Sequence, residues 1–296
     1  MLDPVFFDSM KKDFPNITIL GAGLLGGSLA LALAELENPP NVRLWARKED
    51  TAAAAAKLGI TQATADLAKA VTGANLLILA VPVGAMAALV KDALDAGLAA
   101  GCLITDVGSV KQVVHRTIPP LLESREICFI GSHPMAGSER NGLAAITEDL
   151  FQNAACLLTN DNAAPAEQTA ALERFWTSIG CRTSWMSATV HDELVARISH
   201  LPHLIAASAA RVCLKDPSEG KFGGGGLRDT TRVAAGNPTM WAEIALENRE
   251  ALASLLRESI HDLREILASL ENADQEQVHQ WLATAKQRRE PLNSYL

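Results

Sequence analysis

The stretch that most constrains this chain runs from Ile17 to Ala34. A short apolar run, Ile17–Leu20, is followed by three glycines at G-x-G-x-x-G spacing and then by a segment rich in alanine and leucine. The apolar run is typical of a buried parallel strand, and the last segment is typical of a helix. A strand, a glycine turn and a helix in this order indicate a dinucleotide-binding unit, whereas the glycines alone would indicate only a tight turn.

Each glycine of this motif has a separate physical role. Gly21 makes the sharp turn out of the strand, Gly23 keeps the backbone open to a pyrophosphate, and Gly26 lets the helix pack close to the sheet. The start of the helix offers unpaired N–H groups and the positive end of its dipole to phosphate oxygens. The predicted cofactor-binding set also includes three apolar residues, namely Leu25, Val81 and Pro82.

Apolar runs alternate with helical segments over much of the chain. They predict strands over residues 17–20, 42–46, 76–81, 103–106, 127–130, 155–159 and 181–185. Between them, helices are predicted over residues 52–57, 83–96 and 166–178. This alternation is typical of a doubly wound parallel sheet, in which ligands bind beyond the carboxyl ends of the strands. Two polar clusters, at 105–111 and 131–141, fall at such ends.

Strand signals almost disappear after Ser187. The elements predicted from there on are helices over 190–212, 239–270 and 275–288, and a flexible loop over 220–226. Pro202 predicts a kink in the first of these helices. The predicted fold class is therefore α/β: an N-terminal Rossmann-type doubly wound parallel sheet over residues 1–186, followed by an all-α domain over residues 187–296.

The helix predicted over 239–270 carries an apolar stripe along one side. At 1.5 Å per residue it would span on the order of 48 Å, which is long for a small separate domain. A second copy of the chain would bury this stripe, and we therefore predict a homodimer through an all-α dimerisation domain. The alternative is a helix that lies across its own domain.

Composition narrows the classes of partner and compartment. The formal net charge of −8 argues against nucleic acid. The five cysteines are odd in number, widely spaced and without a C-x-x-C pair, as in proteins of a reducing cytosol. The sequence shows neither a signal peptide nor an apolar run of membrane-spanning length, so we predict a cytoplasmic protein without a membrane partner.

The turn after the second predicted strand bears on the choice of nicotinamide cofactor. An Asp or Glu about 20 residues past the glycines would bind the ribose 2′-hydroxyl of NAD, whereas an Arg suits the 2′-phosphate of NADP. Arg47 and Lys48 occupy this turn, and the first acid after the predicted strand is Glu49. They favour NADP over NAD, and the alternative is a solvated basic turn.

The polar cluster around His133 offers catalytic groups. His133 falls in a predicted polar loop at a strand end, where a histidine can take a proton near neutral pH. A structural hydrogen bond is the alternative role for this ring. Ser109 lies on the neighbouring predicted loop and could share that bond.

Arg228, Asp229 and Arg232 follow the glycine run of the second domain. Arginine pairs bidentately with carboxylates. Because the two arginines are four residues apart, one helical turn, both could face one pocket. In an acidic chain they indicate a clamp for an anionic small molecule, and the alternative is a surface ion pair of Arg232 with Asp229.

Three histidines, His191, His200 and His203, fall in the first helix predicted for the second domain. A zinc site is disfavoured because no H-E-x-x-H pattern is present and Pro202 separates two of the three. His191 and His200 are nine residues apart, which at 3.6 residues per turn places them on opposite faces. We therefore predict no metal site.

Several stretches resemble, in order along the chain, the prephenate/arogenate dehydrogenases of tyrosine biosynthesis. They are Gly21–Ser28, Asp106–Lys111, Gly131–Glu139, His191–His203, and Arg228–Arg232 with Trp241. The Ser-His-Pro-Met-Ala-Gly and Ser-His-Leu-Pro-His strings within them are far more specific than the glycine motif. The resemblance covers nearly the whole chain and implies a Rossmann domain followed by a helical dimerisation domain.

The resemblance also assigns roles to single residues. The catalytic histidine of the family falls on His133, with Ser109 beside it, and its substrate-binding arginine falls on Arg232. Other active-site or supporting positions fall on Glu139, His191, Asp192, His200 and His203, and the predicted substrate-binding set also includes Arg228. NAD-using members carry an acid after the second strand, and its absence here leaves the cofactor open between NADP and NAD.

The implied reaction is the oxidative decarboxylation of prephenate, arogenate or both, with hydride transfer to NAD(P)⁺. His133 would take the hydroxyl proton, the ring carboxylate would leave as CO₂, and aromatisation would supply the driving force. The alternatives are another two-domain imine or hydroxyacid dehydrogenase, or a non-catalytic dinucleotide sensor. The former usually carry a lysine in the first helix of the second domain, and none occurs between Ser187 and Leu214.

Overall fold

A computed structural model describes residues 11–137 and 142–294. The chain divides into two compact units, unit 1 over residues 1–248 and unit 2 over residues 249–296. The domain boundary predicted between residues 186 and 187 marks the change from strands to helices. The division into these two units does not test that boundary, which stays a prediction.

Unit 1 is built on a six-stranded sheet in which every pair of neighbouring strands is parallel. The strands lie in the order β3-β2-β1-β4-β5-β6, with the first βα turn next to the point where the order reverses. Their bounds are β1 (Asn16–Leu20), β2 (Asn41–Trp45), β3 (Ala63–Thr64), β4 (Leu76–Leu79), β5 (Leu103–Asp106) and β6 (Cys128–Phe129). The predicted Rossmann-type sheet is confirmed.

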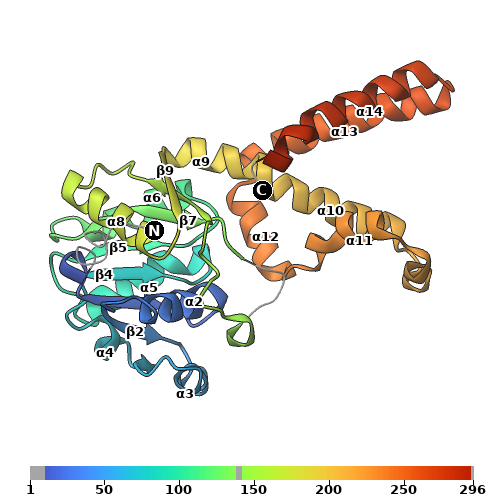
Figure 1. Cartoon of the computed structure of the whole chain (residues 1–296). Helices are drawn as coiled ribbons and strands as arrows, with labels where there is room; N and C mark the ends of the chain where they lie inside the picture. The colour runs from blue at the N-terminus through green and yellow to red at the C-terminus, as the bar shows by residue number, and fades with distance from the viewer. Residues whose placement is uncertain (1–10, 138–141, 295–296) are drawn as a thin grey trace. The chain divides into compact units, whose positions relative to one another are not determined.

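Alternating apolar residues of these strands bury both faces of the sheet. Leu76 and Ile78 of β4 belong to one core cluster, whereas Leu77 and Leu79 belong to the other. The first cluster includes residues of α2 (Leu24–Ala34), α3 (Glu49–Lys57) and α8 (Ala166–Ser178). The second includes residues of α4 (Leu67–Val71), α5 (Val83–Asp95), α6 (Gln112–Thr117) and α7 (Pro119–Leu122). Helices therefore cover both faces, as Figure 1 shows.

A second, three-stranded sheet contains β7 (Gly131–Pro134), β8 (Ala155–Thr159) and β9 (Arg182–Met186). Strand β7 is antiparallel to β8, whereas β8 and β9 are parallel. The prediction that His133 lies in a polar loop is therefore wrong, since the residue belongs to β7 and pairs with Leu157. The alternation of strands and helices predicted these strands but not the sheet that they join, because pairing partners depend on tertiary contacts.

Beyond β9, the described part of unit 1 is helical. Its helices are α9 (Ala188–Val195), α10 (Leu201–Cys213), α11 (Gly225–Thr231) and α12 (Pro238–Glu247). A π-helical turn over Ala196–His200 connects α9 to α10, and Pro202 is the second residue of α10. The flexible loop predicted over 220–226 is wrong, because Pro217–Phe222 forms a 3₁₀ helix and Gly225 begins α11.

The long helix predicted over 239–270 is interrupted. It consists of α12 and of α13 (Arg249–Glu271), with Asn248 between them at φ −106° and ψ 27°. The side chain of Asn248 is buried and makes hydrogen bonds within unit 1. The apolar periodicity continues across the interruption, which is why the sequence alone indicated one helix.

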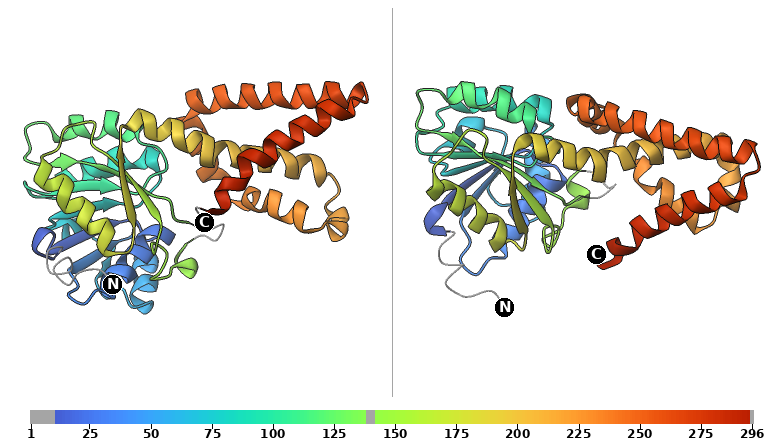
Figure 2. Two further views of the ribbon diagram at one scale, coloured as in Figure 1. Left: turned by 45° about the horizontal axis from the view of Figure 1, so that its top comes forward. Right: turned by 90° about the horizontal axis from the view of Figure 1, so that it is seen from above.

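Unit 2 is a helical hairpin of α13 and α14 (Gln275–Arg289), joined by a tight turn that is visible in Figure 2. Asp274 caps α14 by accepting a hydrogen bond from the backbone N–H of Gln277. Trp281 Nε1 donates to Asp262 across 3.2 Å, which ties the two helices together. In the described part of the chain, no helix is long and apolar enough to cross a membrane.

Candidate active site

The glycine turn after β1 has the shape that the sequence predicted. Gly21 has a φ of +125°, and a Cβ atom there would lie 2.2 Å from the carbonyl oxygen of Ala80. A Cβ on Gly26 would lie 1.9 Å from the carbonyl oxygen of Gly21, so neither position can carry a side chain. A Cβ on Gly23 would have no neighbour within 4 Å, so the backbone there faces open space at the start of α2. This cradle fits the pyrophosphate of a dinucleotide.

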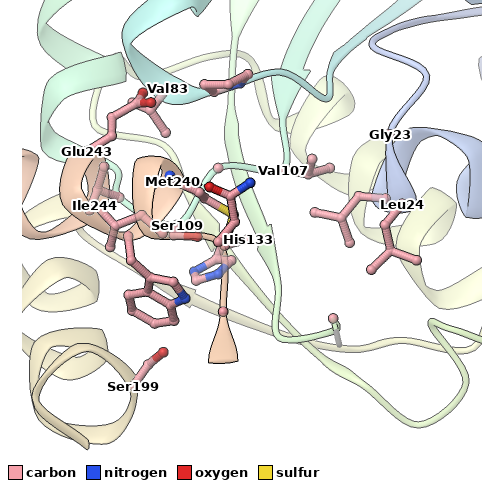
Figure 3. A pocket seen from close by; sticks show the side chains of 18 of the residues that line it. Gly23, Leu24, Val83, Val107, Ser109, His133, Ser199, Met240, Glu243 and Ile244 are labelled. Atoms are coloured by element: carbon pink, nitrogen blue, oxygen red, sulfur yellow. Dashed lines mark hydrogen bonds between the residues drawn. The ribbon is translucent and has the colours of Figure 1, made fainter. Parts of the chain in front are cut away.

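A cavity of about 650 Å³ adjoins this turn. Figure 3 shows Gly23 and Leu24 on one side of it, Glu243 and Ile244 of α12 on the other, and His133 between them. The predicted site residues that line it are Gly23, Leu25, Val81, Pro82, Ser109, His133, His200 and Arg232. Residues far apart in sequence, from the turns after three parallel strands and from the helical part of unit 1, thus converge on one cavity.

Other predicted site residues lie elsewhere. Gly21 and Gly26 shape the turn behind Gly23, and Arg47 and Lys48 are exposed at the end of β2. Glu139 lies outside the described residues.

The two arginines of the predicted clamp are separated. Arg232 lines the cavity, whereas the side chain of Arg228 is 80% exposed and its Nε lies 3.6 Å from Asp229 Oδ1. The prediction that both face one pocket is therefore wrong. Arg228 belongs to α11, and Arg232 begins a 3₁₀ helix, so the two do not share one regular helical turn.

A chain of hydrogen bonds connects Asp192, His191 and His133, all of which are buried. His191 Nδ1 lies 2.7 Å from Asp192 Oδ1, and His191 Nε2 lies 2.9 Å from His133 Nδ1. An ionised carboxylate only accepts, so His191 Nδ1 donates to it. A neutral His191 then has a lone pair on Nε2, which accepts from His133 Nδ1. The neutral His133 ring is thus left with an unprotonated Nε2.

Burial keeps His133 and His191, the two histidines of this hydrogen-bonded series, neutral. Desolvation lowers the pKa of His133 well below its ordinary value, and the charges near it, including Lys111, act in the same direction. Desolvation also lowers the pKa of His191, although its hydrogen bond to Asp192 opposes this shift. Burial opposes ionisation of Asp192, but hydrogen bonds from His191 and the backbone N–H groups of Gln112 and Lys111 lower its pKa overall.

A buried ion pair holds the loop that carries Ser109. Lys111 Nζ and Asp106 Oδ2 are in contact, and both side chains are fully buried. Asp106 also accepts from the backbone N–H groups of Gly108, at 2.9 Å, and Ser132, at 3.2 Å. The pair therefore fixes the turn after β5 against the start of β7, next to His133.

The other two histidines of the helical part also adjoin the cavity. His203 stacks on Trp241 with ring centroids 3.5 Å apart and an interplanar angle of 9°, and Trp241 lines the cavity. Asn248 Nδ2 lies 2.7 Å from the carbonyl oxygen of Asp192 and 3.2 Å from His200 Nδ1. His191 and His200 thus flank one cluster, and the prediction of opposite faces is wrong because the intervening π-helical turn breaks the 3.6-residue period.

Two family models match the chain in succession. The nucleotide-binding domain of prephenate dehydrogenase matches residues 29–185, and the dimerization domain of prephenate dehydrogenase matches residues 187–284. The chain belongs to the prephenate dehydrogenase family. The resemblance drawn from its motifs is therefore confirmed.

Relatives within the prephenate dehydrogenase family span most of the chain. The prephenate dehydrogenase of Bacillus subtilis is 35% identical over 290 residues, which cover 96% of this chain and 77% of the relative. The cyclohexadienyl dehydrogenase of Zymomonas mobilis is 36% identical over 267 residues, which cover 88% of this chain and 90% of the relative.

Solved structures of the prephenate dehydrogenase family share the fold. Prephenate dehydrogenase from A. aeolicus, in complex with hydroxyphenyl propionate and NAD⁺, superposes with a TM-score of 0.85 at 27% identity, covering 94% of this chain and 98% of that one. The arogenate dehydrogenase of Synechocystis superposes with a TM-score of 0.76 at 28% identity, covering 95% of this chain and 100% of that one. This chain is accordingly an NAD(P)-binding oxidoreductase with a dimerisation domain.

Two residues near the cavity, Glu243 and Asn248, were not predicted from the sequence. Glu243 lines the cavity, and its Oε1 accepts a hydrogen bond of 2.5 Å from the backbone N–H of Gly84 in α5. Asn248 holds His200, and the only signal for it was an asparagine, a poor helix former, inside a predicted helix. Among residues 11–137 and 142–294, no group of three His, Cys, Asp or Glu side chains is placed to hold a metal ion.

Proposed function

We propose that the chain catalyses the oxidative decarboxylation of prephenate, arogenate or both, with His133 as the general base. The observation that carries this proposal is the hydrogen-bonded chain from Asp192 through His191, which leaves His133 Nε2 as a proton acceptor at the cavity. The same cavity is lined by Gly23, which suits a dinucleotide, and by Arg232, which suits a carboxylate.

The nicotinamide, when bound, accepts the hydride that leaves C4 of the substrate ring. His133 Nε2 takes the proton of the C4 hydroxyl, and Ser109, which lines the same cavity, hydrogen-bonds to that hydroxyl. Arg232 holds a substrate carboxylate. After the bond to the ring carboxylate breaks and CO₂ leaves, its electron pair makes the ring aromatic. His133 then returns the proton to the phenolate oxygen and ends the reaction neutral.

The experiment is a two-by-two assay of prephenate and arogenate with NAD⁺ and NADP⁺, with and without the substitution His133→Asn. An asparagine Nδ2 can still donate to His191, but it offers no basic nitrogen. We expect turnover of at least one substrate and a fall in kcat of about 10²–10⁴-fold in the variant, with little change in the KM for the cofactor. Failure to turn over either substrate would refute the proposed function, and a near-normal kcat in the variant would remove His133 from the mechanism.

NADP is the proposed cofactor, with NAD as the alternative. The support is that Arg47 and Lys48 are exposed at the end of β2, while the first acid, Glu49, begins α3. Arg47→Asp should weaken NADP⁺ binding by about 2–3 kcal/mol through loss of a charge-assisted pair and added repulsion. A wild type that already favours NAD⁺ would contradict this assignment.

We further propose that the protein is a homodimer through its helical domain. Supporting this are the match to a dimerization domain and three large leucines of α13 that are more than half exposed, namely Leu263, Leu267 and Leu270. Burial of such a stripe is a usual driving force for association. Light scattering should give twice the chain mass of 31.5 kDa at micromolar concentration, and a monomer would refute the dimer.

A further inference from the structure

The ring of His200 presents an unusual pair of nitrogens. The side chain is 1% exposed and lines the cavity, and its Nε2 has no hydrogen-bond partner within residues 11–137 and 142–294. Buried polar atoms are nearly always paired, so an unpartnered one at a cavity indicates a group that is satisfied by a ligand.

Neighbouring groups fix which nitrogen of His200 carries the hydrogen. The carbonyl oxygen of Asp192 can only accept, so the Asn248 atom that lies 2.7 Å from it must be the amide nitrogen. That same nitrogen lies 3.2 Å from His200 Nδ1 and can only donate there. His200 Nδ1 is therefore an acceptor, and in the neutral ring the hydrogen is on Nε2.

The ring is neutral under ordinary conditions. Burial lowers the pKa of His200 to about 4, although Asp192 opposes the shift, so the second proton is absent near neutral pH. The Nε2–H group is thus a neutral donor. Trp241 meets the ring edge to face at a centroid distance of 6.2 Å, and an aromatic face is a weaker acceptor than an oxygen.

We propose that Asn248 is a positioning residue that locks His200 in its Nε2–H form, so that His200 donates a hydrogen bond to a carboxylate or carbonyl oxygen of the substrate. The inference rests on the proposed function for the identity of that substrate. It also explains the interruption between α12 and α13. Asn248 follows the last residue of α12, and its side chain donates to both the Asp192 carbonyl oxygen and His200 Nδ1.

The first test needs no turnover. Two-bond ¹⁵N–¹H correlation spectra of histidine-labelled protein distinguish the two neutral tautomers and the cation, and His200→Gln identifies the signal. We expect an unprotonated Nδ1 and a protonated Nε2 at neutral pH, and the opposite tautomer in Asn248→Asp, because a carboxylate accepts from Nδ1. A wild-type ring with its hydrogen on Nδ1, or with both nitrogens protonated, would overturn the assignment.

The second test measures the bond to the ligand. Glutamine at 200 keeps an N–H near the position of Nε2, whereas phenylalanine keeps only a ring, so these two variants separate the donor from packing. His200→Phe and Asn248→Asp should each raise the KM for the substrate and the Kd of hydroxyphenyl propionate by ~10-fold or more, and His200→Gln by less than ~3-fold. The KM for NAD(P)⁺ should stay constant, and Asn38→Asp, on an exposed turn, is the control for added charge.

The outcomes separate this inference from the proposed function. Equal losses in His200→Gln and His200→Phe, or an unchanged substrate KM in Asn248→Asp, would overturn the inference even if the enzyme is active. If the wild type turns over neither prephenate nor arogenate, the proposed function fails, whereas the tautomer in the spectra still decides the role of Asn248. If Asn248→Asp does not fold, the two variants at position 200 carry the test.

Discussion

His191 Nε2 lies 2.9 Å from Nδ1 of His133, and this contact decides which nitrogen of His133 is basic. His191 can accept there only because its own Nδ1 donates to Asp192 across 2.7 Å. The carboxylate therefore sets the tautomer of a ring that it does not touch. Similar logic applies to Asp-His pairs in hydrolases, where the acid holds the catalytic ring in the correct tautomer.

Replacing Asp192 by asparagine should disturb this tautomer chain. The amide can present its N–H group to His191, which would reverse the hydrogen bonds and leave His133 Nε2 protonated. We expect kcat to fall by about 10²–10⁴-fold, with a much smaller change in the KM for NAD(P)⁺. Steady-state kinetics check this, with Asp95→Asn at an exposed position as the control. An unaffected kcat would show that the hydrogen bonds from Asp192 through His191 do not determine which nitrogen of His133 is basic.

Arg232 and Arg228 form a matched pair for testing the carboxylate site. They are close in sequence, but only Arg232 lines the cavity, while Arg228 is mostly exposed. Arg232→Ala should raise the KM for prephenate by about 10- to 100-fold, and lysine should rescue only partly because it cannot bind both oxygens. Arg228→Ala should change it by less than about 3-fold. Equal effects of the two alanine variants, or an equal rise in the cofactor KM, would contradict this placement.

Lys111 should be costly to remove for reasons of stability. Lys111→Met leaves the carboxylate of Asp106 buried without its cation, and we expect a loss of about 3–5 kcal/mol in the free energy of unfolding. The double variant Lys111→Met with Asp106→Asn should recover part of that loss, because no unpaired charge then remains. Urea denaturation of the single and double variants checks this, and a single-variant loss below about 1 kcal/mol would contradict it.

Stability should fall as pH is lowered from 7 to 5. The pKa values of His133, His191, His200 and His203 are all lowered by burial, so the unfolded chain binds more protons than the folded one below pH 6.5. Protonation then favours unfolding. His200, whose pKa is lowered to about 4, should contribute a loss of about 2 kcal/mol by pH 5, and His133 should add to it in the same direction. Urea midpoints across this range check the slope.

Two histidine variants are the controls for this pH dependence. His200→Gln should flatten the slope, because one proton-binding group of the unfolded chain is gone. His261→Gln should leave it unchanged, because the His261 side chain is 76% exposed and lies outside the buried cluster. A stability that is constant between pH 7 and pH 5 would contradict the neutral, buried state of the cluster.

The sequence by itself determined the parallel sheet, the glycine turn and the family. These rest on local signals: short apolar runs, glycines whose spacing serves a turn, and strings such as Ser-His-Pro-Met-Ala-Gly that are rare by chance. It also predicted His133, Ser109 and Arg232 as site residues, because polar residues at the ends of buried strands and after glycine runs point to ligand sites, and all three line one cavity.

Only the tertiary structure decided which site residues contact one another and which hydrogen bonds they make. The placement of His133 in β7 depends on pairing with β8, and the path of the chain between His191 and His200 depends on a π-helical turn. The role proposed for Asn248 depends on its hydrogen bond to Asp192, 56 residues earlier. Apolar periodicity continues through residues 239–270 whether or not one residue leaves the helix, so it cannot reveal that interruption. Hydrogen-bond partners and tautomers follow from distances between elements, and no local pattern encodes these distances.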